Sequence, residues 1–304
     1  MNCPICKSKK NILIWNDKIR SSIKKLTTHK KKIFRCFVCD VSFLEKRYKF
    51  LPEKSILRKI NRKSQIMKLH LFHSRREEPK LKKILEIYDY KDKKVLLANC
   101  SYGLTILDKI KKTAKLTAGL SESDYSFYVE EYLRKKKHLY FKNLNDIKKT
   151  GKKFDVIISP AEIEHVYNPS RYLKDFKKIL TKNGVIILRI PNHDNIYKYV
   201  LNKIYLKEDY RISHNFYFSK KSCEYLFKKN SFKIKDCLGL MEHDLNNLLH
   251  YIKIFKRPMQ YDKNIVNIFS LNRLKNSTLT KNIEKSPIPS HFLYMIQSTK
   301  YNDN

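Results

Sequence analysis

The stretch FDVIISPAEIEHVYNPSRYLKDFKKILTKNGVIILRIPN, residues 154–192, predicts a strand, a loop, a helix and a second strand. Residues 154–159 are apolar and rich in β-branched side chains, as in a strand buried on both faces. Pro169 suits a first helical turn, and apolar residues then recur at spacings of three and four. These apolar positions are Tyr172, Leu173, Phe176, Ile179 and Leu180. We expect Gly184 to end this helix in a left-handed conformation, before a second buried strand over 185–190.

Strand, crossover helix and strand form a βαβ unit, which predicts a parallel sheet. Ligands of open α/β sheets bind beyond the carboxyl ends of the strands. Glu162, Glu164 and His165 follow the first strand of the unit, and Asn192 and His193 follow the second. We therefore expect the functional site in these two loops.

The composition of the 304 residues indicates one sizeable domain with a small appendage, since 42% are hydrophobic. No apolar run approaches the roughly 20 residues of a membrane span, and no signal-like segment precedes Cys3. Seven cysteines, four of them in two tight pairs, suit metal binding in a reducing compartment. These features predict a cytoplasmic protein.

The net charge of +37 would attract nucleic acid or an anionic membrane surface. The lysines are spread over the whole chain, however, together with many Ile, Asn and Tyr residues. Such a composition is also what the coding bias of an AT-rich genome produces. A nucleic-acid partner therefore stays open but is not favoured.

Two C-x-x-C pairs, Cys3 with Cys6 and Cys36 with Cys39, predict a zinc site. Each pair offers two thiolates to one tetrahedral ion, and residues 12–15 and 32–35 are suited to a hairpin between the pairs. Four cysteines leave no open coordination position, so we expect a structural zinc. A redox dithiol is the alternative, but a second pair and the lack of a preceding βαβ unit argue against it.

The chain divides into three predicted parts: a zinc-ribbon-like module over 1–50, a charged helical connector over 51–78, and a main α/β domain over 79–304 with an insertion at about 242–286. Residues 94–103 of the main domain predict a strand followed by a turn, and further strands are predicted at 115–120, 138–141, 154–159, 185–190, 231–238 and 291–297. Helices are predicted at 81–88, 104–110, 124–133, 195–206 and after the capping residue Ser219.

This alternation resembles the seven-stranded class I S-adenosylmethionine-dependent methyltransferases over roughly residues 81–300. The resemblance is carried by residues 154–158, Glu164-His165-Val166, Pro169, residues 184–186 and Pro191-Asn192. The N-terminal module is similar to one found ahead of sugar and natural-product methyltransferases, sugar C-methyltransferases among them. The resemblance implies a Rossmann-like α/β fold with a small zinc ribbon, and S-adenosylmethionine and zinc as cofactors.

The resemblance also implies cofactor-binding positions. The family's first loop, acid-x-Gly-x-Gly-x-Gly, matches Leu97, Asn99, Ser101 and Gly103, so the acid and two glycines are replaced. The acid that binds the ribose hydroxyls matches Ser121, with Glu122 beside it, and the position that contacts the adenine matches Asp146.

For catalysis, a sulfonium donor needs alignment and exclusion of water more than activation. The acceptor must lose a proton, and His165 is the first candidate base, because histidine is the commonest general base in enzymes. Glu164 is placed to orient it, and His214 and Tyr217 are further candidates. The alternative is that Glu164 and His165 only stabilise their loop.

We therefore expect methyl transfer to a small-molecule acceptor, of which a sugar or nucleotide-linked sugar would suit the basic charge. A catalytically degenerate binding protein is the first alternative, motivated by the replaced glycines and ribose acid. An RNA methyltransferase is the second, since the charge and the zinc module fit it. Against it, the sequence shows no alternation of aromatic and basic residues and no Asn-Pro-Pro-Tyr-like loop after residue 158.

Overall fold

The structure is a computed structural model that describes residues 1–22, 25–49, 81–100, 103–121, 126–201, 203–241 and 278–299. The predicted connector over 51–78 and residues 242–277 of the predicted insertion lie outside the described residues.

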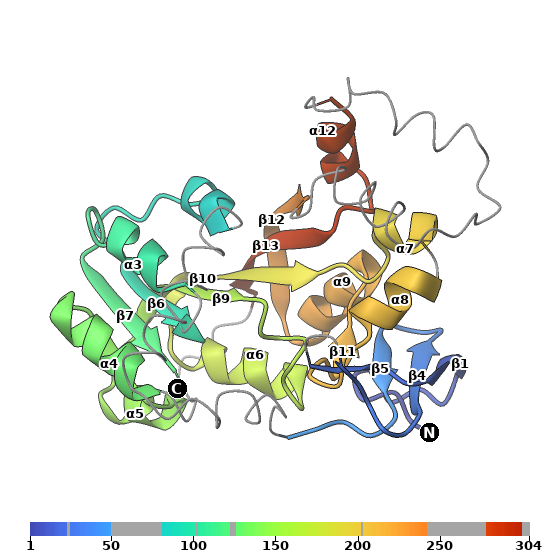
Figure 1. Ribbon diagram of the computed structural model, residues 1–304. Helices are drawn as coiled ribbons and strands as arrows, with labels where there is room; N and C mark the ends of the chain where they lie inside the picture. The colour runs from blue at the N-terminus through green and yellow to red at the C-terminus, as the bar shows by residue number, and fades with distance from the viewer. Residues whose placement is uncertain are drawn as a thin grey trace.

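A seven-stranded mixed sheet forms the centre of the main domain, in the order β12-β13-β10-β9-β6-β7-β8 (Figure 1). Its strands are β6 (Lys94–Ala98), β7 (Leu116–Leu120), β8 (Leu139–Phe141), β9 (Phe154–Pro160), β10 (Leu180–Pro191), β12 (Phe232–Leu240) and β13 (His291–Ser298). Only β13 runs against its neighbours, so the carboxyl ends of the other six strands lie at one edge. This arrangement confirms the predicted α/β fold.

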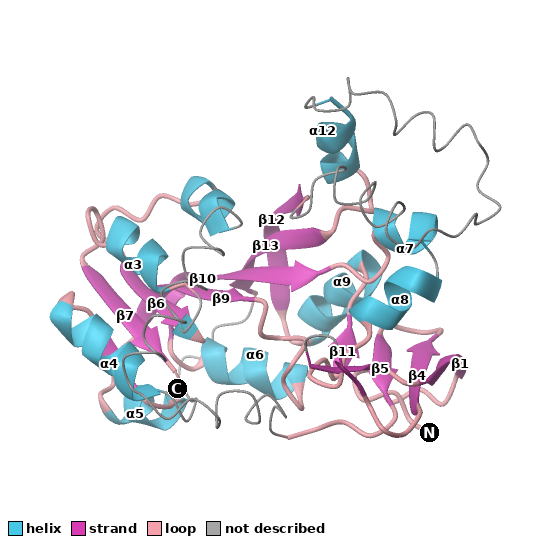
Figure 2. Cartoon of the chain, in the orientation of Figure 1, coloured by secondary structure: helices cyan, strands magenta, loops and turns pink. Residues whose placement is uncertain are grey.

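Helices cover both faces of the sheet (Figure 2). The helices of the described residues are α3 (Leu104–Ile110), α4 (Ser126–Lys135), α5 (Leu144–Lys149), α6 (Pro169–Lys177), α7 (Ile196–Leu201), α8 (Lys203–Asp209), α9 (Lys220–Lys229) and α12 (Thr278–Lys285), and residues 81–86 are also helical. The one helix predicted over 195–206 is thus two shorter helices. Within the described residues, no helix has the length and apolarity that crossing a membrane requires.

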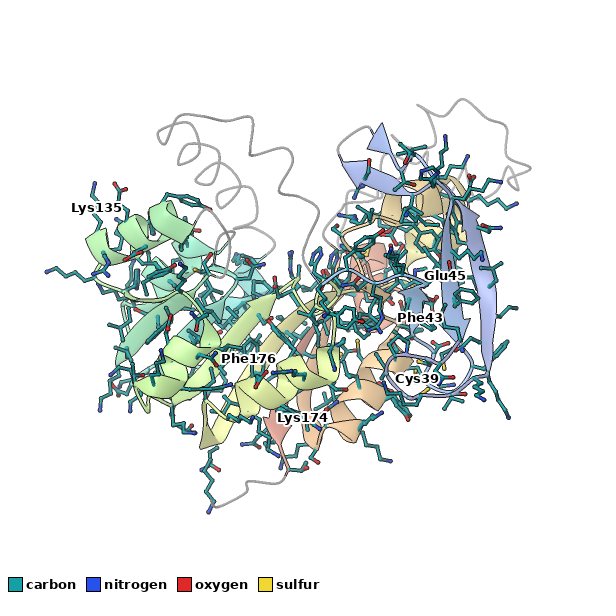
Figure 3. The ribbon with its side chains drawn as sticks, turned by 90° about the horizontal axis from the view of Figure 1, so that it is seen from below. Cys39, Phe43, Glu45, Lys135, Lys174 and Phe176 are labelled. Atoms are coloured by element: carbon teal, nitrogen blue, oxygen red, sulfur yellow. The ribbon has the colours of Figure 1, made fainter. Side chains whose placement is uncertain are left out.

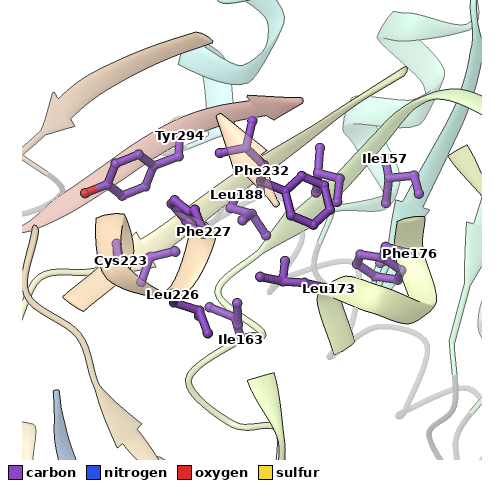
Figure 4. Packing of buried hydrophobic residues seen from close by; sticks show 14 of the residues in the cluster. Ile157, Ile163, Leu173, Phe176, Leu188, Cys223, Leu226, Phe227, Phe232 and Tyr294 are labelled. Carbon is purple, nitrogen blue, oxygen red and sulfur yellow. The ribbon is translucent and has the colours of Figure 1, made fainter. Parts of the chain in front are cut away.

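Successive residues of the central strands face opposite layers of the core. Val156 and Ile158 of β9 pack with α3 and α4, whereas Ile157 packs with α5, α6 and α9. Figure 4 shows this second layer, where Leu173 and Phe176 of α6 and Leu226 and Phe227 of α9 meet Ile157 and Leu188. The apolar runs predicted as strands buried on both faces are therefore confirmed.

The prediction that Gly184 ends the helix is wrong. Helix α6 stops at Lys177, and Leu180 already pairs with Phe154 as the first residue of β10. Gly184 lies inside β10 without a left-handed φ. A Cβ atom there would lie 3.1 Å from the carbonyl oxygens of both Phe154 and Thr181. The glycine is needed because two backbone segments approach it closely.

A four-stranded sheet joins the N-terminal strands to a short strand of the main domain. Its order is β1-β4-β5-β11, with β1 (Asn11–Asp17), β4 (Lys31–Cys36), β5 (Ser42–Leu44) and β11 (Phe216–Tyr217). The short strands β2 (Arg20–Ser22) and β3 (Lys25–Leu26) pair with each other. Strand β11 belongs to the main domain, so this sheet continues from the N-terminal strands into it (Figure 1).

Gly184→Ala and Gly184→Asn test the close approach at Gly184. We expect Gly184→Ala to lower the free energy of unfolding by about 1–3 kcal/mol, as overpacking against backbone atoms does, and Gly184→Asn to lower it further. Urea unfolding measures both, with the exposed Lys182→Ala in the same strand as a control that stays near the wild type. A left-handed glycine would give the opposite order, because asparagine tolerates that conformation better than alanine.

Candidate functional site

The loops that follow β6 and β9 meet at the carboxyl edge of the sheet. Asn99, directly after β6, has a left-handed φ of 47°. Its side-chain amide donates a hydrogen bond to the Glu162 carboxylate in the loop after β9. Ala161, beside Glu162, also has a positive φ, of 51°. The two loops thus turn sharply where they leave the sheet and are tied to each other.

The remaining predicted cofactor residues lie at the same edge or outside the described residues. Gly103 precedes α3 with a φ of −122°, and a Cβ there would lie 3.0 Å from Leu97 Cδ2. Ser121 follows β7, is 1% exposed, and donates its backbone N–H to the Phe141 carbonyl over 3.2 Å. Ser101 and Glu122 are not among the described residues.

Asp146 lies in the first turn of α5, beyond the end of β8. Asn143 caps this helix, because its side-chain oxygen accepts the Asp146 backbone N–H at 3.0 Å. The cap fixes the backbone of Asp146 and leaves its half-buried carboxylate at the edge where β6, β7 and β8 end.

Glu164, His165 and His214 come together and are called the Glu-His cluster below. One potential ligand atom of each lies within 4.8 Å of those of the other two. His165 Nε2 is 3.9 Å from Glu164 Oε1, and the His165 and His214 rings meet edge to face with centroids 4.6 Å apart. Glu164 and His214 are buried, whereas the His165 side chain is 17% exposed.

Asn215 holds the backbone of this cluster in place. Its backbone N–H donates to the Glu164 carbonyl at 2.9 Å, and its side-chain amide donates to the His165 carbonyl at 2.7 Å. The same side chain donates to the Tyr48 carbonyl and accepts the Tyr48 N–H, at 2.8 and 2.7 Å. One buried asparagine therefore connects the N-terminal module to the loop after β9.

Tyr217, the fourth predicted catalytic residue, lies beside His214 with ring centroids 5.7 Å apart. Its hydroxyl accepts the N–H of Arg211 and donates to the carbonyl of Arg211, both at 3.0 Å. Burial raises the pKa of the Tyr217 hydroxyl. In this arrangement Tyr217 closes the turn that carries His214.

Burial and nearby charges shift the pKa values of several ionisable groups around the site. Burial, helped by the nearby cations Arg211 and Arg20, lowers the pKa of His214 well below its usual value. Burial also lowers the pKa of His193. Burial alone would raise the pKa of Asp194, but hydrogen bonds from Arg35 and Lys198 hold it at about 2.

Cys3, Cys6, Cys36 and Cys39 converge and are called the cysteine cluster below. Their sulfur atoms all lie within 4.8 Å of one another, with 3.5 Å between Cys3 and Cys39 and 3.4 Å between Cys6 and Cys36. Figure 3 shows Cys39 beside the N-terminal strands.

The two cysteine pairs form matching turns. Lys7 N–H donates to the Cys3 carbonyl at 3.0 Å, and Asp40 N–H donates to the Cys36 carbonyl at 2.9 Å. Lys7 and Asp40, each directly after the second cysteine of its pair, both have a positive φ. Both C-x-x-C segments therefore bend in the same way and aim two sulfurs each at one point.

Two arginines of the N-terminal module bind loops at the carboxyl edge. Arg35 forms a bidentate pair with Asp40 and a second with Asp194, which follows β10, with distances of 2.7 to 3.1 Å. Arg47 donates to the Tyr167 carbonyl at 2.7 Å and lies 4.5 Å from the centre of the Tyr167 ring. The module therefore contacts the loops after both β9 and β10.

Sequence reasoning named the loops but missed several of the residues that shape them. Asn215, Arg35 and Arg47 are the residues it missed. The partners of Asn215 lie 50 to 167 residues away in the sequence. Arg47 and Tyr167, and likewise Arg35 and Asp194, are 120 or more residues apart. A polar residue between His214 and Phe216, in an otherwise aromatic run, was the one available signal for Asn215. Asn192, which we placed at the functional edge, donates to the carbonyls of Pro287 and Pro289 and so holds the approach to β13.

The sheet order with one antiparallel strand, and the loops gathered at its carboxyl edge, define a Rossmann-like methyltransferase fold. The sequence profile of the family described as "Methyltransferase domain" matches residues 73–236, more than half of the chain. The chain belongs to this family of methyltransferases. A search of curated proteins found no match.

Several solved structures are similar to this chain. One is a protein from Listeria monocytogenes assigned as an S-adenosylmethionine-dependent methyltransferase, which is 14% identical in sequence, with a TM-score of 0.45. The match covers 75% of this chain and 100% of that chain. A protein from Haloferax volcanii assigned as a methyltransferase, in complex with the Trm112 methyltransferase activator, is 11% identical with a TM-score of 0.49, covering 79% of this chain and 97% of that one.

The buried state of His214 makes stability depend on pH. Because its folded pKa lies below the unfolded value, the unfolded chain takes up a proton first as the pH falls below about 6.5, and stability is lost. We expect the free energy of unfolding to fall less steeply between pH 7.5 and 5.5 in His214→Gln than in the wild type. The two slopes should differ by up to ~1.4 kcal/mol per pH unit.

Urea unfolding at three pH values measures the two slopes, and any contribution from the cysteines cancels between them. The exposed His29→Gln is the matched control and should keep the wild-type slope. Equal slopes for His214→Gln and the wild type would show that His214 is protonated equally in both states.

Proposed function

We propose that the protein transfers a methyl group from S-adenosylmethionine to a small-molecule acceptor. The observation that supports this most directly is the Glu-His cluster. It joins the loop after β9, which also carries the Glu162 contact to Asn99, to the turn before β11. A basic nitrogen is thereby held at the edge of the sheet where this fold binds its ligands.

The residues present at this edge fit the cofactor. Asn99 supplies the left-handed conformation that a glycine loop would otherwise provide, so the backbone can approach a ligand there. Asp146, at the start of α5, offers a carboxylate to the adenine amino group, as the family resemblance implies. We propose that the binding region is formed by Asn99, Ser101, Gly103, Ser121, Glu122 and Asp146. Gly103 contributes indirectly, because it lets α3 pack closely on β6.

When bound, the cofactor supplies a methyl group already attached to a good leaving group, so the protein's task is alignment and removal of a proton. His165 Nδ1 donates to the Ser213 carbonyl at 2.8 Å, which leaves the lone pair on Nε2. Glu164 and His214 lie beside this ring, and Tyr217 packs against His214. We propose that Nε2 of His165, the most exposed side chain of the cluster, accepts the proton.

The charges beside the cluster favour an anionic acceptor. Arg211 and Arg20 both act on His214, and cations of this kind attract a phosphate or carboxylate. The diphosphate of a nucleotide-linked sugar is such a group. We propose a sugar as the acceptor, and the charge favours its nucleotide-linked form.

Binding without turnover is the second candidate function. The Asn99 side chain is committed to Glu162, and the acid and two glycines of the usual first loop are replaced. A protein that only binds the cofactor or its product would keep the fold and the contacts at this edge.

We propose that the cysteine cluster holds one structural zinc ion in a module over residues 1–50. A tetrahedral zinc with bonds of about 2.3 Å places its sulfurs roughly 3.8 Å apart, close to the distances observed. The matching turns of the two pairs suit this geometry. Zinc held by four thiolates needs reduced cysteines, in keeping with a cytoplasmic protein.

Metal analysis tests the zinc proposal. After dialysis against EDTA, we expect about one zinc per chain in the wild type and none in Cys36→Ser, because the remaining three thiolates bind too weakly. Cys237→Ser, which lies outside the cysteine cluster, should retain the wild-type content. The same zinc content in all three proteins would refute the assignment.

Calorimetry with S-adenosylhomocysteine tests cofactor binding. We expect the wild type to bind, and Asp146→Ala to bind roughly tenfold more weakly, since a hydrogen bond to a charged group is lost. Asp236→Ala, an exposed carboxylate on β12, is the control and should bind as the wild type does. Absence of heat at high micromolar ligand would exclude the methyltransferase proposal.

If binding is found, methyl transfer separates the two candidate functions. Candidate sugars and nucleotide-linked sugars are incubated with the labelled donor, and His165→Ala is compared with the wild type. Loss of transfer with retained cofactor binding is expected for an enzyme whose proton acceptor lies at His165.

A further inference from the structure

The three side chains of the Glu-His cluster are of types that commonly bind transition metals. So far only proton transfer has been proposed for them. They offer two imidazole nitrogens and one carboxylate oxygen, all within 4.8 Å of one another. Ligand bonds of about 2.0–2.2 Å place the atoms around one ion roughly 3–4 Å apart. Side-chain rotations that bring the farthest pair of these atoms closer by roughly 1–2 Å would therefore complete the set.

The outer contacts of the cluster are those that metal ligands need. His165 Nδ1 donates to the Ser213 carbonyl at 2.8 Å, which orients the ring and keeps Nε2 available as a ligand. The Glu164 carbonyl accepts the N–H groups of Asn215 and Phe216, at 2.9 and 3.1 Å. The segment that carries His214 is thereby hydrogen-bonded directly to the segment that carries the other two ligands.

Burial also separates this cluster from an ordinary surface group. Glu164 is 2% exposed and His214 is 5% exposed. His165 alone reaches solvent, with 17% of its side chain exposed. Three ligands with one open side are typical of catalytic sites, in contrast to the closed set of four thiolates in the cysteine cluster.

We propose that Glu164, His165 and His214 bind one divalent transition-metal cation, and that this cation binds an oxygen of the acceptor. Two imidazoles and one carboxylate suit Mn²⁺, Fe²⁺, Co²⁺ or Zn²⁺. The inference rests on the proposed methyl transfer for its purpose, and it makes His165 a ligand in the cation-loaded protein.

The cation would take over the task of activating the acceptor. It withdraws charge from an acceptor hydroxyl, so that the O–H bond breaks and the proton passes to water. The oxygen then forms its bond to the methyl carbon as the bond from that carbon to sulfur breaks, leaving S-adenosylhomocysteine. The acceptor is therefore a hydroxyl compound, and the anionic group proposed above adds to its affinity for the cation.

Mn²⁺ is the probe that distinguishes the two clusters. Thiolates favour zinc, whereas imidazole and carboxylate ligands accept manganese. Protein dialysed against EDTA, which by the zinc proposal keeps only the zinc of the cysteine cluster, is freed of chelator and titrated with Mn²⁺. The free ion is followed by electron paramagnetic resonance. We expect about one Mn²⁺ per chain in the wild type, and at least tenfold weaker binding in Glu164→Gln, His165→Gln and His214→Gln.

Controls keep the result decisive. His29→Gln removes an exposed histidine and should bind Mn²⁺ as the wild type does. Glu164→Gln keeps the size of the side chain, and its thermal unfolding without metal establishes that it is folded. Mn²⁺ should raise the melting temperature of the wild type and of His29→Gln but not that of Glu164→Gln.

Absence of Mn²⁺ binding in the wild type, or equal binding in the wild type and the three variants, would overturn the proposal. Calorimetry with S-adenosylhomocysteine on the same preparations separates this result from the proposed function. Cofactor binding without Mn²⁺ refutes the metal site alone, whereas Mn²⁺ binding without cofactor refutes methyl transfer and leaves the metal site standing.

Discussion

The pairing of β11 with β5 is the contact on which the rest of the site depends. Phe216 pairs with Phe43 and Tyr217 with Ser42, so two residues of the methyltransferase domain complete the N-terminal sheet. Asn215, directly before them, contributes backbone and side-chain hydrogen bonds to both sides. Because backbone hydrogen bonds fix register, the position of Glu164 and His165 is set by the module as much as by the main sheet.

This dependence gives the cysteine cluster an indirect part in the chemistry. A structural metal contributes its binding free energy to folding, and a small module of this size has little core of its own. Its side chains instead join the cores of the main domain: Phe43 packs with Phe216, and Trp15 packs with Tyr210. The module therefore packs as part of the main domain, beside the candidate site, rather than as an independent unit.

The two halves of the candidate site are preserved in different ways. On the cofactor side the residue types depart from the usual glycine loop, but Asn99 keeps a left-handed backbone and Gly103 keeps the close packing of helix on strand. Around Glu164 and His165 the backbone is held by contacts from distant segments. A substitution in either half would thus act through backbone geometry before it acts through lost functional groups.

The sequence by itself determined the strands, most helices and the cysteine pairs, because hydrophobic period, capping residues and ligand spacing are local properties. It assigned Gly184 to the end of a helix, since sequence shows that a glycine is needed but not whether conformation or close packing requires it. The meeting of Glu164 and His165 with His214, and the clamp at Asn215, were decided by tertiary structure alone. Their partners are about 50 to 167 residues apart, and such contacts depend on how sheets and loops pack rather than on any local pattern.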